Sequence, residues 1–329
     1  MGSRVQAASR CRDSGPAFGE VSPEVIEAVL VRLATENERH LSELPEGAGC
    51  FKEAQIVEFV FLLSEKWRLD QAVRYQAVEL LERFLIKQVE QISKASGKST
   101  KAREQGGGSS RSSLEDQICN TFVLRLVSCV QLASKLSLHY NRVNSDTALK
   151  FLQSLKYSYT KQELLESELA VLKTLHFQVN VSTPLAYVEL LLEVLGYNGC
   201  LLPTKPLHQM CIQLLDFSYL ARDAIYDTLL KIAVENSTPS NLQVAKFLTV
   251  KEDFMLLAVG IISTSMFVLN PGYWQQVVEH LNSITGITSQ SILEFSYALL
   301  KQIIGSTPPR QRYRSCGTKA LEHRIGPLQ

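Results

Sequence analysis

The chain has 329 residues, of which 45% are hydrophobic and 20% are charged, and its formal net charge is +1. This composition is typical of one large or two medium globular domains with a sizeable core. The near-neutral charge supplies no global field that would draw the chain to DNA or to an anionic membrane, so nucleic-acid binding would need a local basic patch.

The cysteines and the apolar stretches exclude several further classes of protein. The seven cysteines are widely spaced and form no C-x-x-C pair, which predicts reduced thiols in an intracellular compartment rather than a zinc site or a disulfide framework. The N-terminus lacks the apolar core of a signal peptide. The longest apolar stretch, 254–269, is too short to span a bilayer and reads as a buried helix. We therefore expect no contact with a membrane.

The first half of the chain shows helix signals throughout. Residues 1–21 are expected to be flexible, and Ser22 followed by Pro23 is typical of a helix N-terminus. The next segment is apolar around most of its circumference, so other helices must enclose it. The helices expected after the first one cover 51–66, 70–88, 114–138, 146–155 and 160–175.

A flexible insertion is expected at 93–113, between the second and third of these helices. It contains three consecutive glycines and seven serines, and it has five basic residues against a single acidic residue, Glu104. Such a segment cannot bury apolar surface, which favours a solvated linker. Contact of its basic residues with an acidic partner or a nucleic acid stays open as an alternative.

Thr183-Pro184 marks a boundary, after which the pattern repeats. A polar connection holds Thr238-Pro239-Ser240, and the tail 305–329 is expected to be disordered. The helices expected here cover 184–195, 205–220, 224–235, 250–269, 273–284 and 289–303. The sequence thus predicts an all-α protein of two consecutive bundles of about five helices each, 22–182 and 183–304.

No catalytic motif is present. The phosphate-binding, dinucleotide-binding, serine-hydrolase, zinc-protease and kinase motifs are all absent, and the six histidines are scattered. We expect no catalytic residues, no metal, no cofactor and no small-molecule substrate, although an enzyme whose residues are distant in sequence stays an alternative. Direct nucleic-acid binding is not indicated either, because the basic excess lies in the insertion and the tail.

Three motifs in order resemble the cyclin box. Residues 67–69 (WRL) lead to 77–85 (AVELLERFL), which is similar to a cyclin segment that ends in an acid, Arg, Phe and Leu. Residues 132–135 (LASK) resemble the motif of the third cyclin-box helix, and 159–177 resembles the fifth helix. The resemblance to the cyclin family implies a cyclin fold of two consecutive five-helix bundles, and a non-catalytic adaptor that binds a cyclin-dependent kinase.

The resemblance also implies roles for individual residues. By motif position, Lys135 and Glu168 would hold the kinase, with Leu132 and Leu136 beside them. Two opposite charges within an apolar patch can give a partner helix its register, whereas an exposed ion pair without a function is the alternative. Ile56 and Phe59 match apolar positions of the cyclin docking patch or, alternatively, belong to the core.

Two positions depart from the cyclin pattern near this docking patch. Lys52 stands where cyclins place the leading Met. Glu53 stands where cyclins place an Arg that pairs with the acid at 82, so Lys52 is the candidate partner of Glu82.

Four further segments are similar to a divergent meiotic group within the cyclin family: 57–65, 126–136, 191–200 and 251–262. This resemblance implies a role in meiosis, in which recombination intermediates mature into crossovers. It also implies recombination factors as partners and a nuclear, chromosome-associated location, with the cytoplasm as a second location. The alternatives are a kinase-independent pseudo-cyclin scaffold that recruits recombination factors, and a nucleic-acid-binding cyclin fold.

Overall fold

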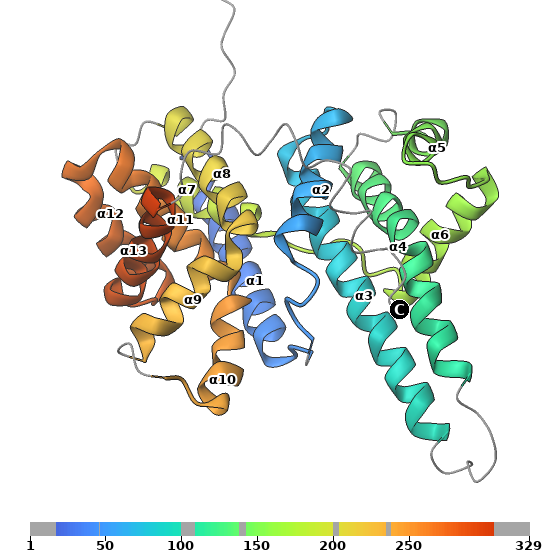
Figure 1. Ribbon diagram of the computed structural model, residues 1–329. Helices are drawn as coiled ribbons and strands as arrows, with labels where there is room; N and C mark the ends of the chain where they lie inside the picture. The colour runs from blue at the N-terminus through green and yellow to red at the C-terminus, as the bar shows by residue number, and fades with distance from the viewer. Residues whose placement is uncertain are drawn as a thin grey trace, which may run out of the picture.

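The computed structural model describes residues 18–45, 47–99, 109–137, 143–199, 204–234 and 238–305, with side chains left out at 95–99, 109–119 and 204. Within these ranges the chain forms thirteen α-helices and no strand (Figure 1). No single helix among them has the length and apolarity to cross a membrane; α10 and α11 reach these limits only as a pair, which is bent by 70°. The prediction of an all-α protein is confirmed.

The first bundle consists of five helices, as predicted: α2 (Ala54–Lys66), α3 (Gln71–Ser99), α4 (Ser109–Leu136), α5 (Ser145–Ser154) and α6 (Lys161–Thr174). Helix α4 is the central element, because it packs against α2, α3, α5 and α6. Its buried side chains include small Ser128, Cys129, Ala133 and Ser134, which let the neighbouring helices approach closely.

Helices α3 and α4 are longer than the sequence predicted, and they run side by side beyond the rest of the bundle (Figure 1). The expected insertion 93–113 is helical up to Ser99 and again from Ser109, while residues 100–108 lie outside the described part of the chain. The expectation failed at both edges because serine and lysine are only moderately less favourable than alanine in a helix, so this composition does not by itself end one.

The second bundle contains seven described helices rather than about five: α7 (Pro184–Tyr197), α8 (Thr204–Leu220), α9 (Arg222–Ala233), α10 (Asn241–Lys251), α11 (Phe254–Leu269), α12 (Pro271–Thr285) and α13 (Ser289–Gly305). Helix α11 lies at the centre and packs against α7, α8, α12 and α13. This arrangement accounts for its nearly unbroken apolar sequence.

The sequence predicted one helix over 250–269 where the chain forms the end of α10 and then α11. The break lies at Glu252 and Asp253, where the Asp253 carboxylate accepts a hydrogen bond from the Leu256 N–H at 2.9 Å and caps α11. Upstream, Ser240 and Gln243 form a reciprocal capping box that begins α10 within the expected polar connection.

Helix α1 (Pro23–Ser42) packs with the second bundle although it precedes the first in sequence. It contacts α7 and α11, and the Tyr187 hydroxyl of α7 donates to the Leu33 carbonyl at 3.1 Å. Part of the segment expected to be flexible, 1–21, is also fixed here, because the Val21 N–H donates to the Glu193 carboxylate at 2.7 Å. Residues 1–17 and 306–329 lie outside the described ranges, and the domain limits stay a prediction.

Candidate functional site

Lys135 and Glu168 lie together, although 33 positions separate them in the chain. Lys135 is in the last turn of α4 and Glu168 is in the middle of α6. The Lys135 Nζ lies 2.6 Å from Oε1 and 2.8 Å from Oε2 of Glu168. The Glu168 side chain is 8% exposed and that of Lys135 is 37% exposed. The pair therefore forms the polar floor of a surface that a partner can still reach.

Local contacts hold α6 in place beside α4. Thr160 and Glu163 form a capping box at the start of α6, so two orphan N–H groups of that end are satisfied. Between the helices, the Ser128 hydroxyl donates to the Ser167 hydroxyl at 2.7 Å, and the Arg125 guanidinium donates to the Ser167 carbonyl at 3.1 Å. Because Ser167 directly precedes Glu168, these bonds fix the carboxylate opposite Lys135.

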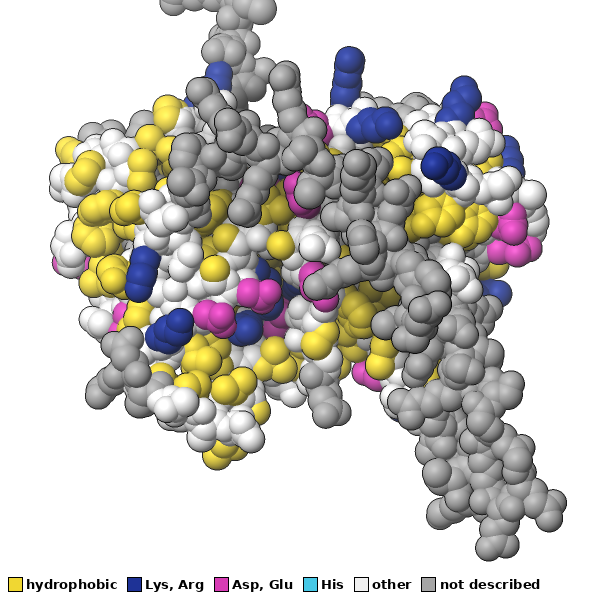
Figure 2. All heavy atoms as spheres, viewed as in Figure 1, with side chains coloured by type: hydrophobic (Ala, Val, Ile, Leu, Met, Phe, Trp, Pro, Cys, Tyr) yellow, Lys and Arg dark blue, Asp and Glu magenta, His cyan; other side chains and the backbone are white. Residues whose placement is uncertain are grey.

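Exposed leucines lie near this ion pair in the sequences of α4 and α6. Leu136, beside Lys135, is 43% exposed, whereas Leu132 is buried in the core. Leu165 and Leu169, which were not predicted as site residues from the sequence, are each 42% exposed and lie three residues before and one residue after Glu168. Their helical spacing was the available signal. We call Lys135, Leu136, Leu165, Glu168 and Leu169 the α4–α6 surface. Hydrophobic side chains also gather on the outside of the α5 and α6 region in Figure 2.

A tight turn follows α6 and projects a large apolar side chain. His176 and Phe177 have φ angles of 51° and 60°, in the left-handed region that favours glycine. The Phe177 N–H donates back to the Leu172 carbonyl at 2.8 Å, which ties the turn to the helix. The Phe177 side chain is 63% exposed, so a phenylalanine is presented to solvent beyond the end of α6.

Lys52 is buried at the junction of the two bundles. Its Nζ lies 3.0 Å from the Glu79 carboxylate of α3 and 2.9 Å from the Glu252 carboxylate after α10, and Arg222 of α9 also binds Glu252. Lys52 was the candidate partner of Glu82, but it pairs with Glu79 and Glu252 instead. We call Lys52, Glu79, Glu82, Arg222 and Glu252 the junction cluster.

Glu82 uses its carboxylate to hold the backbone before α2. Its two oxygens accept hydrogen bonds from the Gly49 N–H at 2.6 Å and the Phe51 N–H at 2.9 Å. Burial raises the pKa of Glu82 to about 7, and the Lys52 ammonium works against this rise. At Glu252 burial also raises the pKa, but Lys52, His40 and Arg222 together outweigh this effect and lower the pKa to about 2. The cluster therefore orders the segment 49–52 and joins it to both bundles.

The expected docking patch lies next to this cluster. Ile56 and Phe59 of α2 are partly buried and pack on the core, and the Phe59 ring centroid is 6.0 Å from that of Phe151. Their use as a docking surface stays a prediction. Lys52 at the leading position does not line an open patch, because its side chain is 4% exposed.

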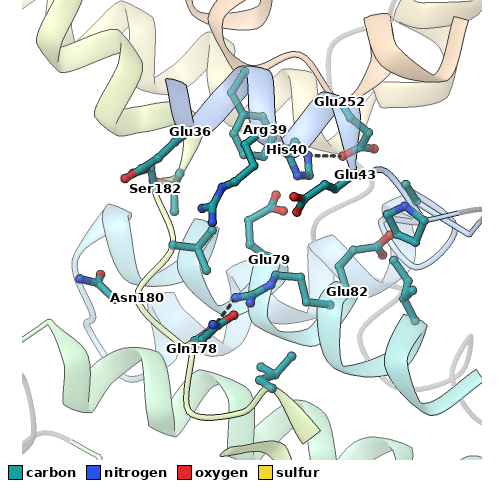
Figure 3. A pocket seen from close by; sticks show the side chains of 18 of the residues that line it. Glu36, Arg39, His40, Glu43, Glu79, Glu82, Gln178, Asn180, Ser182 and Glu252 are labelled. Carbon is teal, nitrogen blue, oxygen red and sulfur yellow. Dashed lines mark hydrogen bonds and ion pairs between the residues drawn. The ribbon is translucent and has the colours of Figure 1, made fainter. Parts of the chain in front are cut away.

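A cavity of about 700 Å³ opens beside the junction cluster. Helix α1 forms one wall and α3 the other, and the segment 174–183 between the bundles closes one side (Figure 3). Figure 3 shows that Arg39 and Glu43 extend into this space from α1. Sequence reasoning missed the cavity because its lining comes from four separate parts of the chain, which only tertiary packing brings together: 32–52, 79–90, 174–187 and 252–254.

Within the described residues, no group of three or more His, Cys, Asp or Glu side chains has the arrangement of a metal site. The chemistry that the arrangement offers is recognition, through the α4–α6 surface and through the charged cavity.

Comparisons with known proteins give similarities over most of the chain. The family model described as "Cyclin, N-terminal domain" matches residues 50–180, which include α2 to α6. Cyclin N-terminal domain-containing protein 1 of Mus musculus is 56% identical over 292 residues, covering 89% of this chain and 87% of the relative. The Homo sapiens protein of the same name is 55% identical over 296 residues, covering 90% of this chain and 89% of the relative.

Proposed function

Since the chain belongs to the cyclin family, we propose that it is a non-catalytic regulatory protein that binds a cyclin-dependent kinase through the α4–α6 surface. The observation that carries this proposal is the Lys135–Glu168 pair, which is partly open to solvent and has exposed leucines near it in sequence on the same two helices. These two residues occupy the positions that the resemblance assigns to kinase binding.

The geometry of the pair suits recognition of a helix. Lys135 directs two short hydrogen bonds to Glu168 and keeps a third N–H donor for a partner. Leu136, Leu165 and Leu169 offer apolar area around it, as in complexes where a partner helix lies in a hydrophobic groove. Closing the partner over the pair would exclude water and strengthen the polar contacts. Phe177 extends this apolar area at the end of α6.

The proposal includes a role in meiotic recombination. In this proposal the protein promotes the maturation of recombination intermediates into crossovers, together with recombination factors, in the nucleus and on chromosomes. What supports it is the similarity of four segments to the meiotic group of the cyclin family: 57–65, 126–136, 191–200 and 251–262. Spread meiotic chromosomes stained for the tagged protein test the location. Staining confined to the cytoplasm would contradict it.

A charge exchange at the pair tests kinase binding. The double variant Lys135→Glu/Glu168→Lys keeps two opposite charges in contact but reverses their polarity toward a partner. Purified full-length protein is titrated with a panel of purified cyclin-dependent kinases by isothermal titration calorimetry. We expect at least one kinase to bind, and the exchange to weaken that binding at least about tenfold, the effect of about 1.4 kcal/mol.

The control places the same charge changes elsewhere. Lys231→Glu/Glu279→Lys alters two exposed residues on α9 and α12 and should leave the affinity unchanged. Equal binding by the exchanged variant and the wild type would contradict the residue assignment. If no kinase binds and the exchanged protein still supports crossovers in meiotic cells, the kinase-independent scaffold replaces the proposal.

A further inference from the structure

The second recognition feature of the molecule is the cavity between α1 and α3, which lies apart from the α4–α6 surface. Two rows of charged residues face each other across it. From α1 come Arg32, Glu36, Arg39, His40 and Glu43, and from α3 come Glu79, Glu82, Arg83, Lys87 and Glu90. Each row follows the three-to-four residue spacing of one helix face.

Most of the carboxylates of the cavity already have partners. Glu36 accepts from the Ser182 hydroxyl at 2.6 Å and from Arg32 at 2.8 Å, and Glu90 pairs with Lys87 at 3.1 Å. Glu79, Glu82 and Glu252 are bound within the junction cluster. Glu43 is the exception, since its carboxylate makes no hydrogen bond or ion pair with the residues that the structure describes.

Two arginines of the cavity, Arg39 and Arg83, have fewer direct partners than its carboxylates do. Arg83 is half-buried and donates to the Gln178 carbonyl at 2.8 Å, and it forms no ion pair with a described carboxylate. Burial lowers the pKa of Arg83, although Glu79 opposes this effect. Arg39, from the opposite wall, has no side-chain hydrogen bond among the described residues (Figure 3). Glu36 and Glu79 act on Arg39 and Arg83 only through longer-range electrostatics. Neither guanidinium group forms a direct ion pair with a described carboxylate, so both keep donors for an incoming anion.

The segment between the bundles adds main-chain hydrogen-bonding groups to the same cavity. Residues 178–183 are neither helix nor paired strand. Arg83 and Gln76 of α3 hold the carbonyls of Gln178 and Val179 at 2.8 Å and 2.6 Å. The next two residues, Asn180 and Val181, line the cavity, and their main-chain groups bond to no other described residue. A fixed segment with free main-chain groups can pair with an extended peptide.

We propose that this cavity binds an extended peptide segment of a partner protein by one acidic side chain. Arg39 and Arg83 hold the acidic group from the two walls, because paired guanidinium groups suit the planar geometry of a carboxylate. The main chain of Asn180 and Val181 hydrogen-bonds the peptide backbone. Glu43 opposes the acidic group by its like charge and so restricts the peptides that enter.

The test is a selection of phage-displayed random octapeptides on the full-length protein, with counterselection on the Arg39→Gln variant. We expect enriched peptides to contain Asp or Glu. Synthetic fluorescein-labelled copies are then measured by fluorescence polarisation. Arg39→Gln and Arg83→Gln should each weaken binding about tenfold, and Glu43→Gln should strengthen it several-fold.

Opposite effects of Arg39→Gln and Glu43→Gln distinguish recognition from a structural role, since Arg39 is exposed in the last turn of α1 and Glu43 is exposed at its C-cap. If Arg83→Gln destabilises the protein, the peptide affinity of Arg39→Gln alone decides whether the proposal holds. Lys246→Gln on α10 is the matched control and should leave binding unchanged. The exchange Lys135→Glu/Glu168→Lys should also leave it unchanged, which separates this site from the kinase surface.

Failure to enrich acidic peptides, or equal binding by wild type and Arg39→Gln, would overturn the proposal. Enrichment of basic peptides would show that Glu43 and the neighbouring carboxylates are the binding groups of the cavity. That result would also overturn the proposal.

Discussion

Lys52 carries its charge in a place where the side chain is 4% exposed. Burying an ammonium group is costly unless carboxylates and hydrogen bonds offset the lost hydration. Glu79 and Glu252 provide that compensation, and Arg222 shares Glu252. Because these residues come from both bundles, the compensation exists only when the bundles are joined.

Glu252 makes this arrangement sensitive to acid. Burial alone raises the pKa of Glu252, but Lys52, with smaller contributions from His40 and Arg222, lowers it from 4.5 to about 2. Since the folded-state pKa is depressed, the ionised group stabilises the fold above pH 4.5, and this contribution is lost as the pH falls toward 2. The difference corresponds to about 3 kcal/mol at neutral pH.

We therefore expect Glu252→Gln to lower the free energy of unfolding at pH 7 by up to about 3 kcal/mol. Its further decline between pH 4.5 and pH 2.5 should be shallower than in the wild type, as measured by urea unfolding at each pH. Glu279→Gln on the exposed face of α12 is the control. An acid decline in Glu252→Gln as steep as in the wild type would contradict the prediction.

The Lys135–Glu168 pair and the junction cluster differ in how much of each could be predicted from the sequence. Lys135 and Glu168 could be predicted because each belongs to a local motif, and the structure brings them into contact. The junction cluster could not, because Lys52 and Glu252 are 200 positions apart and charged residues are usually solvated. Only tertiary packing decides that Lys52 is buried.

At the scale of elements, α11 depends on close approach by its neighbours. Gly260 lies where α11 meets α13, and a Cβ built there would overlap the ring of Phe295. Phe295 is fully buried and cannot move into solvent. Helix α13 can therefore pack this closely only because position 260 lacks a side chain.

Gly260→Ala is expected to destabilise the protein by about 1–3 kcal/mol through overpacking, even though alanine favours a helix more than glycine does. Denaturant unfolding at neutral pH measures the change. Gly272→Ala, in the first turn of α12, is the matched control, because the nearest atom to its new Cβ is 3.6 Å away. That variant should be neutral or slightly stabilised, and a Gly260→Ala protein as stable as the wild type would refute the packing argument.

Helix existence was easier to predict from sequence than helix ends. The apolar run 254–269 correctly predicted α11, because a helix that is apolar all round must be central. Helix α10 was not predicted as a separate element, because its sequence shows little helical periodicity of apolar residues and only Phe247 is buried. The ends of α3 and α4 were missed because a segment rich in serine and lysine was interpreted as a linker, although neither residue excludes a helix.

At the scale of the whole molecule, the two bundles are fastened together by polar and apolar contacts. Tyr75 of α3 donates to Asp216 of α8 at 2.6 Å, and the Tyr219 hydroxyl donates to Glu79 at 2.9 Å. The rings of Tyr75 and Tyr219 also lie 5.3 Å apart. The interface therefore excludes water, and neither bundle keeps all its buried partners without the other.

We expect a single thermal unfolding transition by differential scanning calorimetry, since loss of one bundle exposes buried charges of the other. Lys52→Met leaves Glu79 and Glu252 without their cation and should cost about 3–5 kcal/mol. The transition should then fall by on the order of 10 °C. Lys150→Met on exposed α5 is the control. Two separated transitions in the wild type would contradict this cooperativity.

The position of α1 sets an order of events during synthesis. This helix ends at Ser42, but one of its packing partners, α11, begins only at Phe254. At about 5–20 residues per second, the ribosome needs roughly 10–40 s to deliver that partner. The first bundle and α7, the other packing partner of α1, are complete before then, so the apolar stripe of α1 stays only partly covered until α11 follows. A nascent chain arrested before α11 thus exposes part of the apolar stripe of α1, which chaperones would be expected to cover.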